Sequence, residues 1–431
     1  MKKVMIISYY WPPGGGAGVH RWLKFAKYLR HYGWEPIVYT PENPEYPETD
    51  ASLLKDLPTD LLTIRRKIRE PYRLYKLFTG RSMGEKIQAG FLSENRKPGQ
   101  ADKLATWLRG NLFIPDARKF WIRPSVRYLS RWLSAHPVDA VVSTGPPHSM
   151  HLIALGLKQG HNIPWLADFR DPWSQIDFYH KLRLTPWADK KHKALERRVL
   201  HTADRVVTVS NHWAGGLRQL SNRHIDVVTN GFDPEDFLDV PDYTHERFTL
   251  THLGSMNADR NPRVLWEVIK DLVMHVPGFS DHLEIRLIGK TDIAVRQALE
   301  SLELQAFVNH IPYLPHDKAL EITGASAILL LPLNNTPNVM GIAPGKLYEY
   351  LALKRPILCV GPPNGDAAGI IQETGSGITL GFQDRGGMHE ALLKWYTAFL
   401  SGELGRVEGS AGRFSRIALT GQIAEILNGM V

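Results

Sequence analysis

Short apolar runs alternate with amphipathic stretches from the start of the chain. Residues 3–9 form an apolar run typical of a buried strand, and residues 19–31 follow with apolar positions at helical spacing. A second apolar run over 36–40 completes a predicted strand–helix–strand unit. We expect further strands over residues 140–143, 165–168, 205–209 and 225–229. Strands that alternate with helices predict a parallel sheet covered on both faces.

The pattern starts again in the second half of the chain. Its predicted strands cover residues 248–253, 284–288, 327–331 and 356–360, and its predicted helices cover 262–276, 316–323 and 345–353. A turn-rich, acidic segment over 230–246 separates the halves and predicts a hinge. We therefore expect an N-terminal α/β domain over 1–240 and a C-terminal one over 246–410. Helical spacing within 411–431 predicts a C-terminal helix that could return to the first domain.

Composition places the chain among ordinary globular proteins. Of its 431 residues, 43% are hydrophobic and 22% are charged, which excludes collagen-like, disordered and disulfide-stapled classes. The single cysteine, Cys359, lies in an apolar run, where a buried structural thiol is far more common than a nucleophile. No apolar run approaches the ~18 residues that a membrane-spanning helix requires. These observations predict a cytoplasmic protein in a reducing compartment.

The net charge of +8 is concentrated in one part of the chain. Residues 65–131 hold 17 Lys and Arg against 5 Asp and Glu, a balance of +12, which leaves −4 for the rest. Aromatic residues are interleaved with these cations, among them Trp107, Phe113 and Trp121. This predicted basic insert offers a surface for an anionic membrane or a polyphosphate, and the alternative is a set of solvated helix faces with aromatic undersides. The sequence contains no recognised nucleic-acid module, so we expect no nucleic-acid partner.

A glycine-rich loop follows the first predicted strand. Gly14, Gly15 and Gly16 lie between two prolines and the first predicted helix. Only backbone without Cβ atoms brings several N–H groups close to an anion at a helix N-terminus. The spacing is not that of a dinucleotide-binding fingerprint, which needs a glycine where Val19 or Arg21 stands. The loop therefore predicts a site for an anionic or polar ligand, and the alternative is a tight turn without one.

The sequence lacks the common motifs that bind metals. It contains no His-Glu-x-x-His, no cysteine cluster and no Asp-x-Asp. Lys346 is not a Walker lysine, because Leu347 stands where that motif has Ser or Thr. His148 and His151 have the spacing of adjacent helical turns, and we interpret them as packing or polar histidines. We expect no metal and no cofactor, so basic side chains and helix dipoles would have to neutralise a phosphate.

Two segments of the second half offer such groups. Gly254 and Ser255 directly follow a predicted strand and are themselves followed by Arg260 and a proline-led helix start. Further along, Lys346 opens a predicted helix, and Glu349 lies on the same side one turn later. A phosphate at the helix start and a hydroxyl-rich ring beside the carboxylate would use both groups.

Taken in order, these motifs resemble those of family 4 glycosyltransferases of the GT-B fold. The segments that carry the likeness extend over nearly the whole chain: 12–16, 143–148, 167–173, 203–210, 229–233, 254–255 and 344–352. The resemblance implies an α/β protein whose two Rossmann-like parallel-sheet domains face each other across a cleft. It also implies transfer of a sugar, with retention, from a nucleotide-sugar held mainly by the C-terminal domain. The implied acceptor is a glycan or a lipid-diphosphate-linked glycan in cell-envelope or exopolysaccharide synthesis.

The resemblance assigns donor-site roles residue by residue. Glu349 matches the second glutamate of the family's Glu-x7-Glu motif, which binds the ribose hydroxyls of the donor. Arg260 and Lys346 match the basic pair on the diphosphate. Gly341 stands where the motif has its first glutamate, which contacts the transferred sugar, so this chain departs from the family pattern there. The other predicted donor-site residues are Gly254, Ser255, Pro344, Gly345 and Leu347.

The resemblance also places a reacting centre in the N-terminal domain. Arg170 falls near the position of a histidine in many members, and Asp168 and Asp171 flank it, so these three residues are the predicted catalytic group. The glycine-rich loop and His148 are the predicted phosphate or acceptor loop. The implied mechanism is a front-face displacement in which the departing diphosphate oxygen takes the acceptor's proton.

Two other functions remain open at this point. One is a catalytically weak binding protein of the same fold, which the glycine at position 341 makes conceivable. The other is a nucleotide-sugar epimerase, which the block over 344–352 disfavours. The basic insert would place the protein at the inner leaflet of the membrane if it binds anionic lipid.

Overall fold

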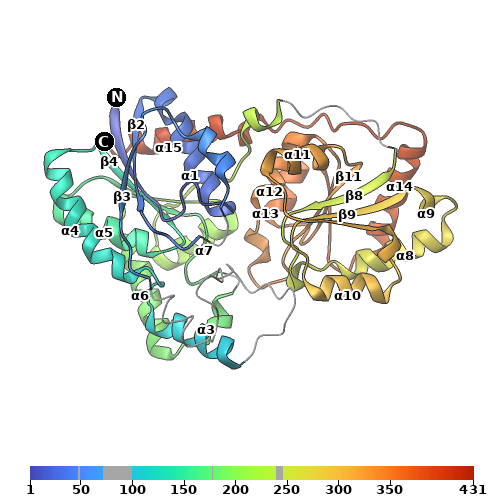
Figure 1. Ribbon diagram of the computed structural model, residues 1–431, viewed down its shortest axis with the longest axis horizontal. Helices are drawn as coiled ribbons and strands as arrows, with labels where there is room; N and C mark the ends of the chain where they lie inside the picture. Colours follow the sequence, from blue (N-terminus) through green and yellow to red (C-terminus); the bar gives the residue numbers. More distant parts are fainter. Residues whose placement is uncertain (47–48, 71–99, 177, 239–245) are drawn as a thin grey trace. The chain divides into compact units, whose positions relative to one another are not determined.

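Two compact α/β units make up the protein. The computed structural model describes residues 1–46, 49–70, 100–176, 178–238 and 246–431 (Figure 1). Among these, the first unit contains residues 1–70, 100–230 and 416–431, and the second contains residues 231–415. The chain thus leaves the first unit after Asn230 and returns to it at Arg416.

In the described residues of the first unit, seven parallel strands form one sheet, in the order β3-β2-β1-β4-β5-β6-β7. The strands are β1 (Lys2–Ile7), β2 (Trp34–Pro41), β3 (Leu62–Arg66), β4 (Ala140–Gly145), β5 (Trp165–Phe169), β6 (Arg205–Thr208) and β7 (Asp226–Val227). Met5 on β1 lies opposite Ile37 of β2 on one side and opposite Val141 of β4 on the other. The order of the strands therefore reverses between β1 and β4.

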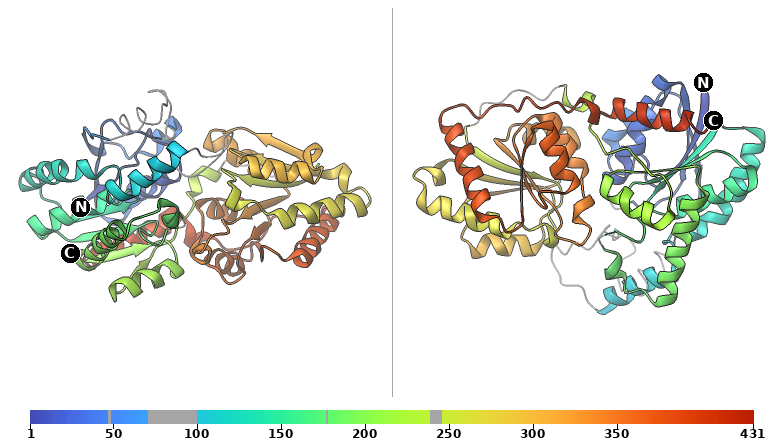
Figure 2. Two further views of the ribbon diagram at one scale, coloured as in Figure 1. Left: turned by 90° about the horizontal axis from the view of Figure 1, so that it is seen from below. Right: turned by 180° about the vertical axis from the view of Figure 1, so that it is seen from behind.

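Helices cover both faces of this sheet. They are α1 (Ala17–Tyr28), α3 (Gln100–Leu112), α4 (Lys119–Ala135), α5 (Ser149–His161), α6 (Pro186–Thr202), α7 (Asn211–Ser221) and α15 (Arg416–Asn428). Side chains alternate along β1, so that Val4 and Ile6 share a core with α1 and α15, whereas Met5 and Ile7 share one with α4 and α5. The C-terminal α15 lies beside α1 (Figure 2), where Ile423 is fully buried.

The second unit repeats this plan with six parallel strands in the order β10-β9-β8-β11-β12-β13. The strands are β8 (Phe248–Leu253), β9 (Leu283–Ile288), β10 (Val308–Ile311), β11 (Ile328–Pro332), β12 (Ile357–Val360) and β13 (Gly377–Leu380). The helices are α8 (Arg263–His275), α9 (Phe279–His282), α10 (Ile293–Ser301), α11 (His316–Gly324), α12 (Gly345–Leu353), α13 (Asp366–Thr374) and α14 (Arg385–Leu400). Alternate residues of β11 again face two cores, with Leu330 packed with α8 and α14 and Leu331 packed with α12 and α13.

The predicted alternation of strands and helices is confirmed, and both sheets are parallel as expected. The sequence patterns missed β3, β10 and β13, each of which lies at an edge of its sheet. An edge strand buries few positions, so its apolar signal is weak; in β10, for example, no residue is fully buried. Cys359 is buried on β12 as predicted, and burial raises the pKa of its thiol to about 12.

The predicted aromatic surface of the basic insert is wrong for Trp121 on helix α4, whereas Phe120 on the same helix is 52% exposed. Trp121 is 2% exposed and stacks on Tyr39 of β2, with ring centroids 4.9 Å apart. Tyr128 and Trp132 on the same helix pack partly against the same core, while its arginines are exposed. The rest of the insert, residues 71–99, lies outside the described residues. In the described ranges, no helix combines the length and the apolar character needed to cross a bilayer.

Candidate functional site

The predicted site residues lie at the carboxyl ends of strands, beside the point where each sheet reverses its strand order. In the first unit this point lies between β1 and β4, and in the second it lies between β8 and β11. Loops that leave neighbouring strands in opposite directions at such a point open a crevice, and ligands of parallel α/β sheets bind there. The fold therefore provides one candidate ligand-binding edge in each unit.

The glycine-rich loop of the first unit runs from β1 to the N-terminus of α1. A Cβ on Gly14 would lie 2.9 Å from the Tyr46 ring, so this glycine is required by packing. Its N–H donates to the carbonyl of Trp11 and does not serve a ligand. Gly16 has a φ of +83° and precedes the first turn of α1, which contains no acidic residue. The positive end of this helix has no acidic side chain in its first turn, which is compatible with the predicted anion site.

Asp168 is a buried structural acceptor rather than an exposed reacting group. It has no solvent exposure and accepts hydrogen bonds from Arg21, Trp22 and Thr144. The Trp22 indole donates at 2.6 Å and the two Arg21 nitrogens donate at 3.2 Å. Because its oxygens are fully engaged by α1 and β4, Asp168 fastens these elements to β5. Asp168 was predicted as a catalytic residue, and this placement favours a structural role instead.

Arg170 and Asp171 follow β5 and reach the surface of the first unit. The Arg170 guanidinium donates to the carbonyl oxygens of Gly18 at 2.9 Å and Pro146 at 3.3 Å, which join the loops after β1 and β4. It also contacts Asp171 at 3.4 Å. The side chain of Arg170 is 12% exposed and that of Asp171 is 35% exposed. Of the three predicted catalytic residues, Asp171 is therefore the most accessible to a ligand.

His148 and His151 belong to a packed group behind this edge. The His148 ring stacks on Trp173 at a centroid distance of 4.6 Å, and Nδ1 of His151 lies 2.8 Å from the Ser143 hydroxyl. Burial lowers the pKa of His151 to about 3 and holds the pKa of His148 well below its usual value. Both rings are therefore neutral at physiological pH. Their placement agrees with packing histidines, whereas His148 was also predicted as a residue of the acceptor loop.

The carboxyl end of β8 begins the candidate site of the second unit. Gly254 ends this strand with a φ of +96°, and a Cβ at this position would lie 3.0 Å from Nζ of Lys346. Lys346 stands in the first turn of α12, whose N-terminus has no side-chain cap and no acidic residue. Nζ of Lys346 lies 3.2 Å from Nε2 of His252, which is buried on β8. The geometry thus brings a glycine turn, a lysine and a helix N-terminus together.

A second basic side chain adds to the positive potential of this site. Nη1 of Arg260 donates to the carbonyl of Ser255 at 2.9 Å, which fixes the arginine against the loop after β8. Burial and the nearby Arg260 hold the pKa of Lys346 well below its usual value, while Glu349 raises it. Two cations that destabilise each other in this way favour an anion between them.

Glu349 lies on α12 one turn after Lys346, as predicted. Its carboxylate is 25% exposed, and Oε1 lies 3.0 Å from Nε2 of His316 at the start of α11. Gly341 is buried at the end of a short 3₁₀ turn, so no acidic side chain stands at that position. Leu347, which was predicted as a donor-site residue, has a side chain that is fully buried in the core beneath α12. Pro344 caps the helix, and Gly345 is exposed at its start.

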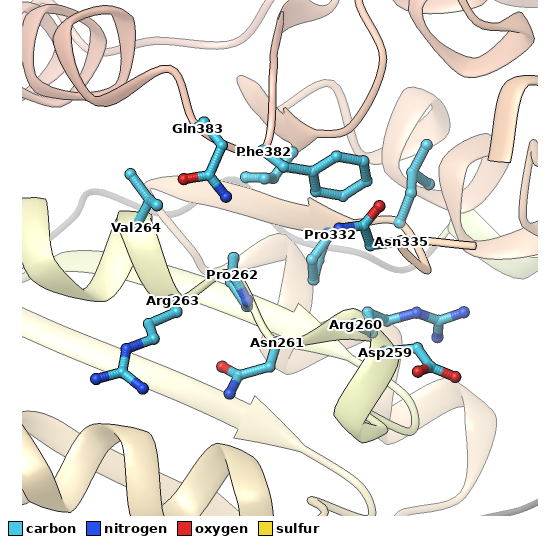
Figure 3. Close-up of a pocket in the computed structure, with 12 residues that line it drawn as sticks. Asp259, Arg260, Asn261, Pro262, Arg263, Val264, Pro332, Asn335, Phe382 and Gln383 are labelled. Carbon is cyan, nitrogen blue, oxygen red and sulfur yellow. The ribbon is translucent and has the colours of Figure 1, made fainter. Parts of the chain in front are cut away.

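A pocket with about 380 Å³ of empty volume lies at the same edge of the second sheet. Its wall is formed by residues from the loop after β8, the start of α8 and the ends of β11, β12 and β13: Asp259, Arg260, Asn261, Pro262, Arg263, Val264, Pro332, Leu333, Asn335, Val360, Phe382 and Gln383. Figure 3 shows Phe382 and Gln383 across the pocket from Pro262, while Arg263 is directed away. The N–H of Asn335 donates to the Asp259 carbonyl at 2.7 Å and so joins two walls. An apolar centre with amide groups at its rim therefore adjoins Arg260.

Sequence reasoning missed several residues that the structure brings to these sites. Arg21 and Trp22 occupy the first predicted helix, and His252 and His316 stand close to motifs that had been recognised. A lone histidine two residues before Gly254, on a strand that is otherwise uncharged, was a usable signal for His252. The partners of the two α1 residues lie 146 and 147 positions away in the chain, so no local pattern reports them.

Comparison with known proteins agrees with this architecture. Residues 15–231 match the family described as the glycosyl transferase 4-like domain. Sucrose-phosphate synthase from Thermosynechococcus elongatus is 14% identical, with a TM-score of 0.61. The alignment covers 100% of this chain and 99% of that chain. HepE from Anabaena, solved in complex with UDP-glucose, is 13% identical with a TM-score of 0.60, and each chain is covered to 100%. WaaG, a glycosyltransferase involved in lipopolysaccharide biosynthesis, is 14% identical with a TM-score of 0.57, covering 99% of this chain and 100% of that one.

A search of curated protein sequences finds no match. Identities this low report similarity of fold, and the family assignment rests on the match to residues 15–231, which is half of the chain. The two parallel sheets, their strand orders and the full-length structural matches agree with the resemblance that the motifs predicted. The chain therefore belongs to the glycosyl transferase 4-like domain family and is a glycosyltransferase of the GT-B fold.

Proposed function

We propose that the protein transfers a sugar, with retention of configuration, from a nucleotide-sugar to a glycan or lipid-diphosphate-linked acceptor in cell-envelope or exopolysaccharide synthesis. One observation carries the donor half of this proposal. Lys346, Arg260 and the uncapped start of α12 converge at the carboxyl edge of the second sheet, with Glu349 one turn away. HepE, a protein of similar fold, was solved with UDP-glucose, which supports a nucleotide-sugar as ligand.

The charges of this site suit a departing diphosphate. Negative charge grows on the bridging oxygen as the sugar leaves, and positioned cations stabilise it most effectively where water is scarce. Lys346 and Arg260 would supply this stabilisation, so we propose that no metal ion is needed. The Glu349 carboxylate would accept hydrogen bonds from the ribose hydroxyls, and His316 holds one of its oxygens in place.

We assign acceptor binding to the first unit. Its carboxyl edge presents Asp171 beside Arg170 and the positive end of α1. Asp171 would orient an acceptor hydroxyl, and Arg170 would hold the two loops that flank it. The bound diphosphate oxygen would take the acceptor's proton, so the first unit needs no strong base of its own.

The donor assignment is tested by ligand binding. We expect one of the UDP, GDP or ADP sugars to raise the melting temperature of the protein, because a ligand that binds only the folded state stabilises it. Lys346→Ala and Glu349→Ala should each weaken this ligand about tenfold or more, as expected when a charged hydrogen bond is lost. Lys318→Ala, at an exposed pair on α11, is the matched control. Unchanged affinity in both site variants would refute the assignment.

The reaction itself is tested by product analysis. A transferase given donor and acceptor forms a glycoside, whereas an epimerase converts the nucleotide-sugar without an acceptor and a binding protein leaves it intact. Anomer analysis of the product by NMR distinguishes retention from inversion. Activity that survives a chelator would support a metal-independent reaction, and loss of activity restored by a divalent cation would contradict it.

A lipid-linked acceptor requires the protein to reach a membrane, and one surface of the first unit supports this. Trp187 at the start of α6 is 62% exposed, and Phe120 and Leu112 near α4 and α3 are 52% and 53% exposed. Nζ of Lys191 lies 4.8 Å from the Trp187 ring centroid, and that of Lys119 lies 5.2 Å from the Phe120 centroid. Exposed aromatic rings combined with cations are typical of surfaces that enter a lipid headgroup layer.

The two lysines of this surface are close enough to repel each other. Burial, followed by the charge of Lys191, lowers the pKa of Lys119. An anionic surface would relieve this repulsion, with each nearby cation contributing about 1 kcal/mol of attraction. We therefore propose that the protein is cytoplasmic and binds anionic membranes through this surface.

Vesicle co-sedimentation tests the membrane proposal. We expect more binding to anionic than to neutral vesicles, a decrease in high salt, and loss of binding in Trp187→Ala and Lys191→Glu. Leu400→Ala, which changes a residue 57% exposed on α14, is the control. Binding that ignores lipid charge, or that survives both substitutions, would overturn the proposal.

A further inference from the structure

His252 is a fully buried imidazole directly behind the lysine of the donor site. It lies on β8, two residues before Gly254, and has no solvent exposure. Its Nδ1 atom lies 3.1 Å from the carbonyl oxygen of Leu330 on the adjacent strand β11. Its Nε2 atom lies 3.2 Å from Nζ of Lys346. One ring thus connects the strand at the centre of the sheet to the first turn of α12.

The ring also has a backbone hydrogen bond with Ser255, which raises its pKa. Its contacts with Leu330 and Lys346 fit one protonation state. A carbonyl oxygen only accepts hydrogen bonds, so the nitrogen facing Leu330 must carry the proton. The other nitrogen is then an acceptor, and an ammonium group is a donor without acceptor capacity, so Lys346 donates to it. Burial, and after it the charges of Lys346 and Arg260, hold the pKa of His252 well below its usual value. The ring is therefore neutral, as this arrangement requires.

A neutral acceptor at this place has a specific consequence for the lysine. A carboxylate would orient the ammonium group equally well but would cancel its charge. An apolar side chain would preserve the charge but leave a buried donor unsatisfied, which is costly. A neutral imidazole fixes the direction of Nζ and leaves its positive charge available beside the Gly254 turn.

We infer that His252 is a positioning residue that aims the Lys346 ammonium at the diphosphate of the donor without neutralising it. The inference rests on the proposed function, because it takes Lys346 to be the diphosphate contact. His252 touches no ligand in this scheme and acts only through the lysine.

The titratable groups that face Lys346 come from three elements, and two of them are charged. Arg260 approaches from the loop after β8, Glu349 lies on the lysine's own helix, and His252 contributes its neutral ring from β8. Removing the imidazole acceptor would destabilise the charged lysine, since Arg260 already opposes it. The protonated lysine would then be lost at a lower pH than in the wild type.

Three substitutions separate positioning from simple packing. His252→Gln retains an oxygen acceptor near the position of Nε2, His252→Asn retains a donor toward Leu330 but loses the acceptor, and His252→Phe fills the volume without either group. Calorimetry with UDP, GDP and ADP first identifies the nucleoside diphosphate that the wild type binds. The variants are then titrated with that diphosphate and with the matching nucleoside, which lacks phosphates.

We expect His252→Asn and His252→Phe to weaken diphosphate binding about tenfold or more, as for loss of a hydrogen bond to a charged group, with nucleoside binding unchanged. His252→Gln should recover most of the affinity. In His252→Asn, the decline of diphosphate affinity with rising pH should also move to lower pH, which a packing defect would not cause. His252→Asn keeps the test usable if the phenylalanine variant does not fold.

Two failures are distinguishable. If Lys346→Ala binds the diphosphate as tightly as the wild type, the lysine is not the contact and the proposed donor site falls. If Lys346→Ala loses affinity but His252→Asn and His252→Phe do not, the donor site stands and the positioning role of His252 is refuted. Equal losses of diphosphate and nucleoside binding in the His252 variants would also refute it.

Discussion

Replacement of Asp168 separates a structural role from a catalytic one. In the first unit its carboxylate is 0% exposed and accepts four hydrogen bonds, two of them from an arginine that is itself 1% exposed. Asp168→Ala would leave the charge of Arg21 buried, with the carbonyl oxygens of Val228 and Thr229 still accepting from it. The substitution therefore removes the charge partner while most of the arginine's surroundings persist.

The expected loss of stability is large. Breaking a buried ion pair by removing one partner typically costs about 3–5 kcal/mol, because an uncompensated charge stays in a low-dielectric site. The Trp22 indole and the Thr144 hydroxyl also lose their acceptor, and each unsatisfied buried donor adds about 1–3 kcal/mol. These contributions come from one connected network and do not simply add, so we expect the free energy of unfolding to fall by about 4–6 kcal/mol. Asp168→Asn keeps the volume and some acceptor capacity and should lose less.

Hydrogen exchange measured by mass spectrometry is the suitable assay, because a protein with two units does not unfold in one step. Amide protection should fall in peptides from α1, β4 and β5, while peptides from the second unit serve as an internal reference. Asp171→Ala is the matched control, since its side chain is 35% exposed and a surface substitution changes stability by only about 0.5 kcal/mol. Protection of α1 and β5 unchanged in Asp168→Ala, together with lost turnover, would refute the structural role and restore the catalytic one.

Three further expectations follow from the same geometry. Arg170→Ala should lower turnover more than tenfold, measured by initial rates, while donor affinity measured by calorimetry stays within about threefold of the wild type. Turnover retained within about threefold would show that the arginine is only structural. Gly254→Ala should destabilise the second unit by about 1 kcal/mol because its φ is +96°, and should weaken diphosphate binding because the new Cβ would meet Nζ of Lys346; full affinity in a melting series would contradict this. The hydrogen bond from Arg286 lowers the pKa of Glu284 in the folded protein, so the unfolded chain takes up a proton first and stability falls as the pH drops through the folded pKa. Glu284→Gln should make the stability measured by denaturant titration depend less on pH in the acid range. An unchanged pH dependence would argue against the pair.

The sequence by itself determined the class of fold and pointed to the segments of the proposed donor site. Apolar runs such as Val4 to Ile7 bury residues on both faces of a sheet, and this two-sided burial appears directly as continuous hydrophobicity. The turn at Gly254 and the helix opened by Lys346 are local features, because a glycine with positive φ and a helix start depend on neighbouring residues. Such short-range requirements can be recognised in the sequence without any knowledge of the fold.

Only the tertiary structure decided which polar residues reach the surface and which are buried. Asp168 and Asp171 stand three positions apart in one motif, yet one is buried beneath α1 and the other reaches solvent. The sequence predicted Trp121 as a surface aromatic residue, whereas in the structure it stacks on Tyr39 in the core. His252 gained a role only when packing brought Lys346, 94 positions away, to its ring. Burial and long-range pairing depend on how distant strands and helices assemble, and this information is spread over the whole chain rather than written in any one segment of it.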